Sequence, residues 1–100
     1  MSSYVVAQIT INDREKYARY EAGFMDVFDQ FGGQILAVDE APESIEGRWP
    51  HTRTVLLRFD NLADAKAWYH SEQYQALAKH RWEASIADIA FVQGLPQATS

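Results

Sequence analysis

Side chains able to bind an organic acid are concentrated between residues 46 and 82, a segment that contains all three tryptophans, all three histidines and four of the six arginines. Two guanidinium groups can hold a carboxylate or an enolate, and aromatic rings can line a slot for the rest of the molecule. The residues that could form such a binding site are Arg53, Arg81, Tyr74, Trp49 and Glu46.

The same residues also allow a purely structural interpretation. Glu46 would pair with Arg53 or Arg81 and fasten a long loop to the end of a helix, while Trp49 would cover the core. Two arginines buried side by side need a counter-charge, which either Glu46 or a bound acid must supply. The sequence leaves both interpretations open.

The three histidines do not form a familiar metal motif. His70 and His80 fall on different faces, on either side of an expected helix break, and no carboxylate stands in an H-E-x-x-H frame. We therefore expect no metal and no cofactor, although a haem ligand could come from either of these helical positions. His51 is the best candidate for a catalytic base, because it stands where a loop meets a strand beside Arg53. An exposed loop histidine without a catalytic role is the commoner case.

Alternation of apolar and polar residues predicts four strands. The third strand should turn Arg53, Val55, Leu57 and Phe59 towards the helices, and the second should have Ile35 and Leu36 on opposite sides, with Ala37 beside the first and Val38 beside the second. The strands cover residues 4–11, 34–39, 52–59 and 88–93.

An aromatic stripe at helical spacing predicts a helix between the first two strands. Asn12 and Glu15 have the spacing of a capping box, so the helix should begin there. It should end at Gly32-Gly33, where glycine can adopt the left-handed conformation.

The second helix should begin after Asn61 and break at Ser71, which can cap a second, differently angled piece. We assign Tyr69 to the core, and the position of Trp68 at the margin of the apolar face leaves its role open.

The order strand, helix, strand, strand, helix, strand predicts an α+β fold of the ferredoxin-like βαββαβ type, a four-stranded antiparallel sheet with two helices on one face. Residues 1–96 would form this single domain, and residues 97–100 a loose C-terminal tail. The open sheet face is too apolar for a small monomer, so we expect a homodimer through that face.

The expected topology also predicts which residues meet. With the two central strands parallel, the start of the third strand would lie beside the end of the second helix and the start of the first strand. Arg53, Arg81, Tyr74, Tyr4 and residues 46–49 would then converge. Whether a cavity exists between residues 42–51 and the second helix would separate a binding site from a structural role.

Composition limits the partners. A net charge of −5 has the wrong sign for binding a nucleic-acid backbone. The lack of cysteine excludes disulfides and thiolate metal sites. No apolar run reaches the roughly 18 residues of a membrane span, and the start of the chain lacks a signal-peptide pattern. We expect a cytoplasmic protein without nucleic-acid or membrane partners.

Several segments together resemble the uncharacterised bacterial family called domain of unknown function number 1330. The resemblance implies a dimeric α/β-barrel, and it implies no assigned activity, although the fold is shared with small monooxygenases, haem-degrading enzymes and stress-response proteins. The segments are GG at 32–33, EGRWPHTRTVLLRF at 46–59, AKAWYHSEQYQALAKHR at 65–81 and QG at 93–94.

Two classes of function remain. The first is a dimeric module that is non-catalytic or binds a small molecule. The alternative is a cofactor-independent, monooxygenase-like enzyme that acts on a small aromatic or acidic metabolite, with His51 in the wall of the site.

Overall fold

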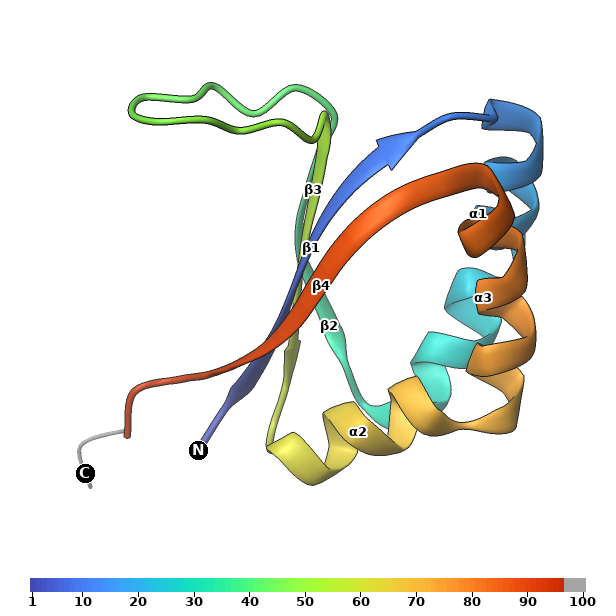
Figure 1. Ribbon diagram of the computed structural model, residues 1–100. Helices are drawn as coiled ribbons and strands as arrows, with labels where there is room; N and C mark the ends of the chain where they lie inside the picture. Colours follow the sequence, from blue (N-terminus) through green and yellow to red (C-terminus); the bar gives the residue numbers. More distant parts are fainter. Residues whose placement is uncertain (97–100) are drawn as a thin grey trace.

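The computed structural model describes residues 1–96, in which three helices cover one face of a four-stranded sheet (Figure 1). Among these residues, none of the helices combines the length and the apolar character that crossing a membrane requires. The predicted tail, residues 97–100, lies outside the described residues. The elements are β1 (Ser3–Ile11), α1 (Arg14–Phe28) with the short 3-10 helix η1 (Asp29–Phe31), β2 (Gln34–Asp39), β3 (Arg53–Phe59), α2 (Leu62–His70), α3 (Glu72–Ala84) and β4 (Ser85–Gln93).

The strand order is β2-β3-β1-β4, and every neighbouring pair is antiparallel. This is the predicted α+β ferredoxin-like fold. The expectation of parallel central strands is wrong, because Ile9 of β1 lies opposite Arg53 of β3 and Tyr4 lies opposite Arg58. The crossover through α1 makes β2 parallel to β1, and β3 then returns in the opposite direction. The start of β3 therefore lies beside the end of β1.

The core lies between the sheet and the helices. Val5, Ala7 and Ile9 alternate towards it along β1. Trp68 is a core residue with 2% of its surface exposed, and its ring lies 4.3 Å from that of Tyr74 between centroids. The assignment of Tyr69 to the core needs correction, since that ring is only partly buried.

A β-bulge changes the faces of β2. Its register against β3 shifts between Ile35 and Ala37. Because a bulge adds one residue to a strand, Val38 returns to the helix side together with Ile35. The prediction of opposite sides for these two residues was wrong, and both contribute to the cavity described below.

Asp13, rather than Asn12, caps α1. The Lys16 amide donates to Asp13 Oδ1 at 3.1 Å, whereas the Asn12 amide donates to the Ala84 carbonyl at 2.7 Å and joins the loop to the end of α3. At the other end, the chain leaves the helical region at Gly32, which has a left-handed φ of 73° as the glycine pair predicted.

Ser71 serves both helix pieces, as predicted. Its hydroxyl accepts from the Tyr74 amide at 3.1 Å and donates to the Trp68 carbonyl at 2.8 Å. Asn61 caps α2 by accepting from the Asp64 amide. The change of direction at Ser71 brings the Trp68 and Tyr74 side chains together in the wall of one cavity.

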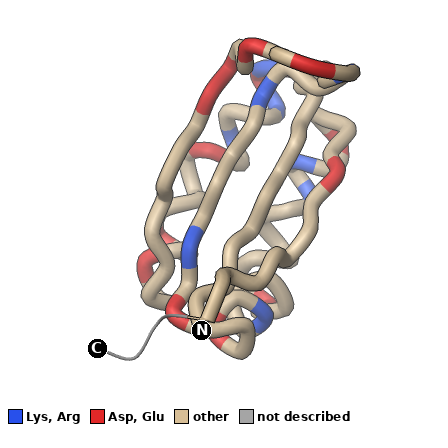
Figure 2. The backbone as a smooth tube through the Cα atoms, turned by 90° about the vertical axis from the view of Figure 1, so that its left-hand side faces the viewer, with Lys and Arg blue, Asp and Glu red and all other residues tan. Residues whose placement is uncertain are grey.

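The sheet face opposite the helices is uncovered within residues 1–96. Figure 2 views the molecule from this side, and β1 carries no charged residue. Leu36, Ile86 and Val92 are about half exposed or more. The connection between β2 and β3 projects to this same side, away from the helices (Figure 1).

Candidate functional site

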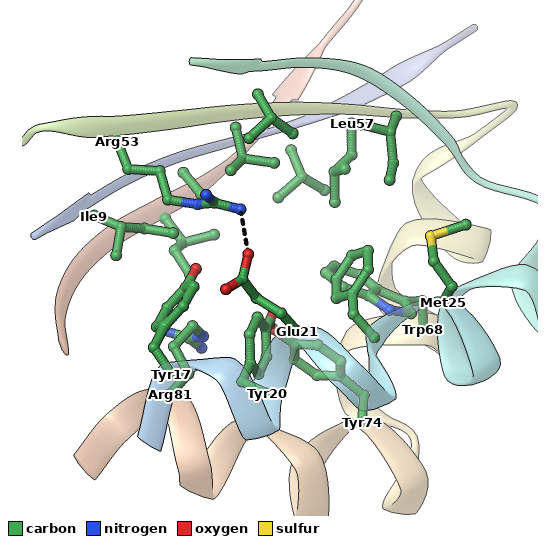
Figure 3. Close-up of a pocket in the computed structure, with 17 residues that line it drawn as sticks. Ile9, Tyr17, Tyr20, Glu21, Met25, Arg53, Leu57, Trp68, Tyr74 and Arg81 are labelled. Atoms are coloured by element: carbon green, nitrogen blue, oxygen red, sulfur yellow. Dashed lines mark hydrogen bonds and ion pairs between the residues drawn. The ribbon is translucent and has the colours of Figure 1, made fainter. Parts of the chain in front are cut away.

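A cavity of about 170 Å³ lies between the helix-facing side of the sheet and helices α1 and α3 (Figure 3). A dry cavity of roughly 150 Å³ can hold a benzene-sized molecule, so a single ring fits. The most exposed side chains that line the cavity come from β2 and α1, namely Ile35, Val38, Glu21 and Met25. The mouth therefore lies between these two elements. No residue of 42–51, where the sequence left the existence of a cavity open, lines this one.

The two ends of the cavity differ in character. Arg53, Arg81 and Tyr17 lie together at one end, while Leu57 and Trp68 lie towards the other (Figure 3). Charged groups at one end and apolar groups at the other suit an amphiphilic small molecule.

Arg81 is a buried cation without an ionic partner among the described residues. Only 4% of its surface is exposed, and its Nε and Nη2 atoms have no hydrogen-bond partner there. Its Cζ lies 5.7 Å from the centroid of the Tyr20 ring, which offsets part of the cost of desolvation. An unpaired buried charge is expensive, so this residue marks a place where an anion would stabilise the protein.

Other unpaired donors line the same cavity. Arg53 Nε and Trp68 Nε1 are buried and have no partner within residues 1–96. Guanidinium and indole groups donate hydrogen bonds and cannot accept them. The cavity therefore offers donors to a molecule that supplies acceptors.

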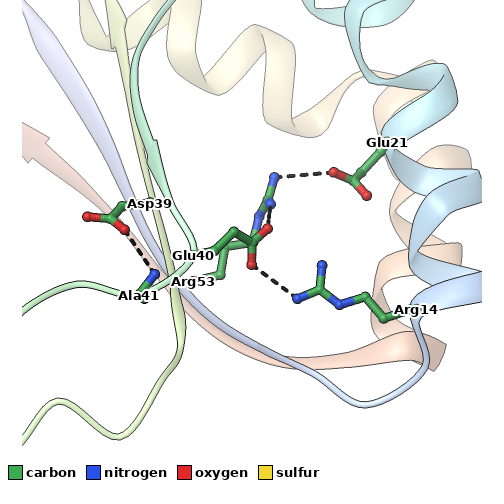
Figure 4. Close-up of polar contacts among 6 residues, drawn as sticks. All are labelled: Arg14, Glu21, Asp39, Glu40, Ala41 and Arg53. Carbon is green, nitrogen blue, oxygen red and sulfur yellow. Dashed lines mark hydrogen bonds and ion pairs between the residues drawn. The ribbon is translucent and has the colours of Figure 1, made fainter.

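Arg53, unlike Arg81, already has carboxylate partners (Figure 4). Its Nη1 donates to Glu40, and its Nη2 lies 3.5 Å from Glu21 Oε2. Arg14 binds Glu40 from the other side at 3.1 Å, and this hydrogen bond, with help from Arg53, holds the pKa of Glu40 below its usual value. The Arg53 guanidinium also lies over the Tyr17 ring, 5.4 Å from its centroid.

The tyrosines of the cavity do not neutralise the arginines. Tyr20 and Tyr74 share a hydrogen bond of 2.7 Å between their hydroxyl oxygens. Burial, reinforced by Tyr74, raises the pKa of Tyr20 well above its ordinary value. Burial also raises the pKa of Tyr17 against the opposing effect of Arg53. Both hydroxyls are neutral at physiological pH.

The structure brings together half of the predicted site. Arg53, Arg81 and Tyr74 converge as expected. Tyr4 lies on the opposite face of the sheet because side chains alternate along β1, and it lies beside Arg58 at the far end of β3 because the two strands are antiparallel. Glu46 is exposed in the loop and is not the partner of either arginine.

Trp49 and His51 also lie on the open sheet face. Trp49 Nε1 donates to Thr54 Oγ1 at 3.1 Å. His51 Nδ1 lies 3.0 Å from Thr10 Oγ1, and its Nε2 lies 2.6 Å from Asp88 Oδ2. Within residues 1–96, no group of three or more His, Cys, Asp or Glu residues is placed to hold a metal ion. The catalytic role of His51 stays a prediction, and it would belong to a different site from the cavity.

Sequence reasoning missed the acidic partners of Arg53 and two of the tyrosines. Glu40 follows β2 directly and lies near the start of β3, so a correct hairpin register would have suggested its contact with Arg53. Glu21 follows Tyr20 at the margin of the aromatic stripe of α1, and Tyr17 belongs to that stripe. The stripe predicted burial and gave no sign of a cavity.

Solved structures share this fold at low sequence identity. A protein of unknown function from Rhodopseudomonas palustris has a TM-score of 0.77 and 14% identity over 96% of this chain and 84% of its own. A cofactor-independent oxygenase from Streptomyces nogalater has a TM-score of 0.59 and 10% identity over 99% and 98% of the two chains. A dimeric protein of unknown function with a ferredoxin-like fold from Bacteroides fragilis NCTC 9343 has a TM-score of 0.57 and 13% identity over 93% and 96%.

A sequence comparison with curated proteins finds no significant match. A comparison with family profiles matches residues 2–95 to one family. This family is the one that the sequence was found to resemble. The match spans both arginines of the cavity and nearly all of the described fold. The chain therefore belongs to the family described as Domain of unknown function (DUF1330).

Proposed function

We propose that this protein binds a small aromatic carboxylic acid in the cavity between the sheet and the helices, with Arg81 as the anchor of the carboxylate. The observation that carries the proposal is the buried Arg81 guanidinium, which has unpaired donor atoms and no ionic partner among the described residues. A carboxylate would supply both the missing charge and the missing acceptors.

The rest of the cavity suits the remainder of such a molecule. Trp68 and Leu57 provide an apolar surface away from the arginines (Figure 3). The volume of about 170 Å³ admits one aromatic ring. Benzoate has this combination of size and charge and is a suitable probe.

The test compares the wild type with Arg81→Met in a thermal unfolding assay with benzoate. At ten times Kd, binding would stabilise the wild type by about 1.4 kcal/mol, which raises Tm by roughly 6–11 °C. Arg81→Met should abolish this shift. It should not destabilise the free protein, because methionine fills a similar volume without burying an unpaired charge.

Arg19→Met is the matched control, since Arg19 is exposed on α1 and does not line the cavity. This variant should keep the benzoate shift. The proposal would be overturned by a wild type that does not respond to benzoate or related single-ring acids, or by an Arg81→Met variant that responds equally.

We also propose that the protein is a homodimer through the open sheet face. Its exposed apolar residues support this assembly. The connection between β2 and β3 extends to the same side and carries Ile45, 93% exposed, where a second copy could contact it. The similar protein from Bacteroides fragilis is described as dimeric. The cytoplasmic location expected from the sequence stays a prediction.

The alternative of a cofactor-independent, monooxygenase-like enzyme has one supporting feature. Donors that can hold a carboxylate can also stabilise an enolate. The similar fold of an oxygenase does not transfer its activity. Because binding needs only the cavity, it is the function that the geometry supports best.

A further inference from the structure

Glu21 stands at the mouth of the cavity with its carboxylate directed towards Arg53 (Figure 3). It is the one acidic side chain among the described residues that line this cavity. Its side chain is 46% exposed, so the carboxylate is in contact with both the cavity and solvent.

The contact between Glu21 and Arg53 is loose. Its 3.5 Å between Oε2 and Nη2 is at the outer limit of a hydrogen bond. Only the Glu21 side chain of this pair is half exposed, since that of Arg53 is 11% exposed, but a long contact to a solvated carboxylate contributes little to stability. Moving the Glu21 carboxylate into water therefore costs the fold little.

Arg53 keeps a second partner when Glu21 leaves. Glu40 binds its Nη1 and is itself held by Arg14, outside the cavity lining (Figure 4). Nη2 is then free to serve a different acceptor. The carboxylate of a bound acid would lie at this end of the cavity, where it would repel Glu21 at short range.

We infer that Glu21 is an internal competitor for the ligand. Its carboxylate occupies Nη2 of Arg53 in the free protein and moves into solvent when the carboxylate of an aromatic acid takes that position between Arg53 and Arg81. This inference rests on the proposed binding of an acid in the cavity. Glu21 would thereby lower the affinity for anions and leave the affinity for neutral molecules of the same shape unchanged.

The experiment measures Kd for benzoate and for benzamide by titration calorimetry in wild type, Glu21→Gln and Asp26→Asn. Glu21→Gln should bind benzoate about three to ten times more tightly, because the substitution removes the competing charge and keeps the shape. Its affinity for the neutral benzamide should match that of the wild type.

Asp26→Asn is the matched control, since Asp26 is exposed on the same helix and does not line the cavity. Its charge is exposed to solvent, which screens it, and it makes no contact with Arg53, so its benzoate Kd should change by less than about twofold.

Three results would overturn the inference in different ways. If the wild type binds benzoate and Glu21→Gln binds it no more tightly, Glu21 is not a competitor and the binding function stands. If neither protein binds benzoate, the binding function and the inference both fail. Equal tightening for benzoate and benzamide would show a change of shape rather than of charge, and would also overturn the inference.

Discussion

The hydroxyl groups of Tyr20 and Tyr74 satisfy each other inside the wall of the cavity. Their oxygens are 2.7 Å apart, and the side chains are almost completely buried. Because burial and the neighbouring Tyr74 raise the pKa of Tyr20, the folded protein retains this proton at a pH where the unfolded chain has lost it. Because Tyr20 keeps its proton, its hydroxyl gives the neighbouring Arg81 no negative charge.

The free energy of unfolding of the wild type should therefore fall at alkaline pH. In the Tyr20→Phe variant the free energy of unfolding should fall less steeply. Below about pH 10, the ordinary pKa of tyrosine, both states hold the proton and the contribution of Tyr20 is intact. As pH rises further, the unfolded state releases the proton first, and stability is lost at up to about 1.4 kcal/mol per pH unit. Urea unfolding at pH 8 and pH 11 measures the difference.

At pH 8 the Tyr20→Phe variant should be less stable than the wild type by about 1 kcal/mol, because Tyr74 loses its partner. An alkaline loss as steep in Tyr20→Phe as in the wild type would contradict the assignment of the raised pKa to this residue.

At the scale of elements, the passage from α1 to β2 depends on two adjacent glycines for different reasons. Gly32 has the left-handed φ of 73°, and a Cβ there would meet nothing within 4 Å. A Cβ at Gly33 would lie 2.5 Å from Phe28 Cζ and 2.8 Å from Phe59 Cε1. Gly32 is needed for backbone conformation, and Gly33 is needed because β2 approaches the aromatic core closely.

Both Gly→Ala variants should be destabilised, and a second substitution separates the causes. Gly32→Ala should cost about 1 kcal/mol through backbone strain. Gly33→Ala should cost about 1–3 kcal/mol through overpacking. Adding Phe28→Leu should recover part of the loss at Gly33 and none of the loss at Gly32, as a double-mutant cycle by chemical denaturation would measure.

If the double-mutant cycles gave the same coupling energy to Phe28 for both glycines, the assignment of backbone strain to Gly32 and overpacking to Gly33 would be contradicted. A Gly33→Ala variant as stable as the wild type would show that the two phenylalanine rings can move aside without cost.

At the scale of the whole molecule, the two faces of the sheet have different environments. The helix side forms the core and the cavity. The other side presents a row across three strands in which Val6 pairs with Leu56 on one neighbour and Ala90 on the other. A chain of this size buries a modest share of its surface, so covering this row with a second copy would add to stability.

Val6→Lys should convert the proposed dimer to a monomer, because it places a charge at the centre of the apolar row. Light scattering after size exclusion at micromolar concentration measures the mass, and circular dichroism checks the fold. Gln73→Lys, at an exposed position on α3, is the control and should remain dimeric. A monomeric wild type, or a dimeric Val6→Lys, would contradict the proposed interface.

The sequence by itself determined the order of elements, the ferredoxin-like fold class and the helix break at Ser71. These follow from local signals, namely alternation, an aromatic stripe and capping side chains, which act within a few residues. The sequence also indicated Arg53, Arg81 and Tyr74 as site residues. They belong to the segment between residues 46 and 82, where arginine and aromatic residues are concentrated.

Only the tertiary structure decided which charges meet. Because the central strands are antiparallel, Tyr4 lies at the other end of β3 from Arg53. The bulge in β2 turns Val38 towards the cavity. The loop between β2 and β3 places Trp49 and His51 on the sheet face opposite the cavity. Glu40 and Glu21, rather than Glu46, reached Arg53. Ion pairs between distant segments depend on strand register and on the path of a loop, and neither is encoded in local periodicity. Arg81 was left without an ionic partner in the described fold by that same packing.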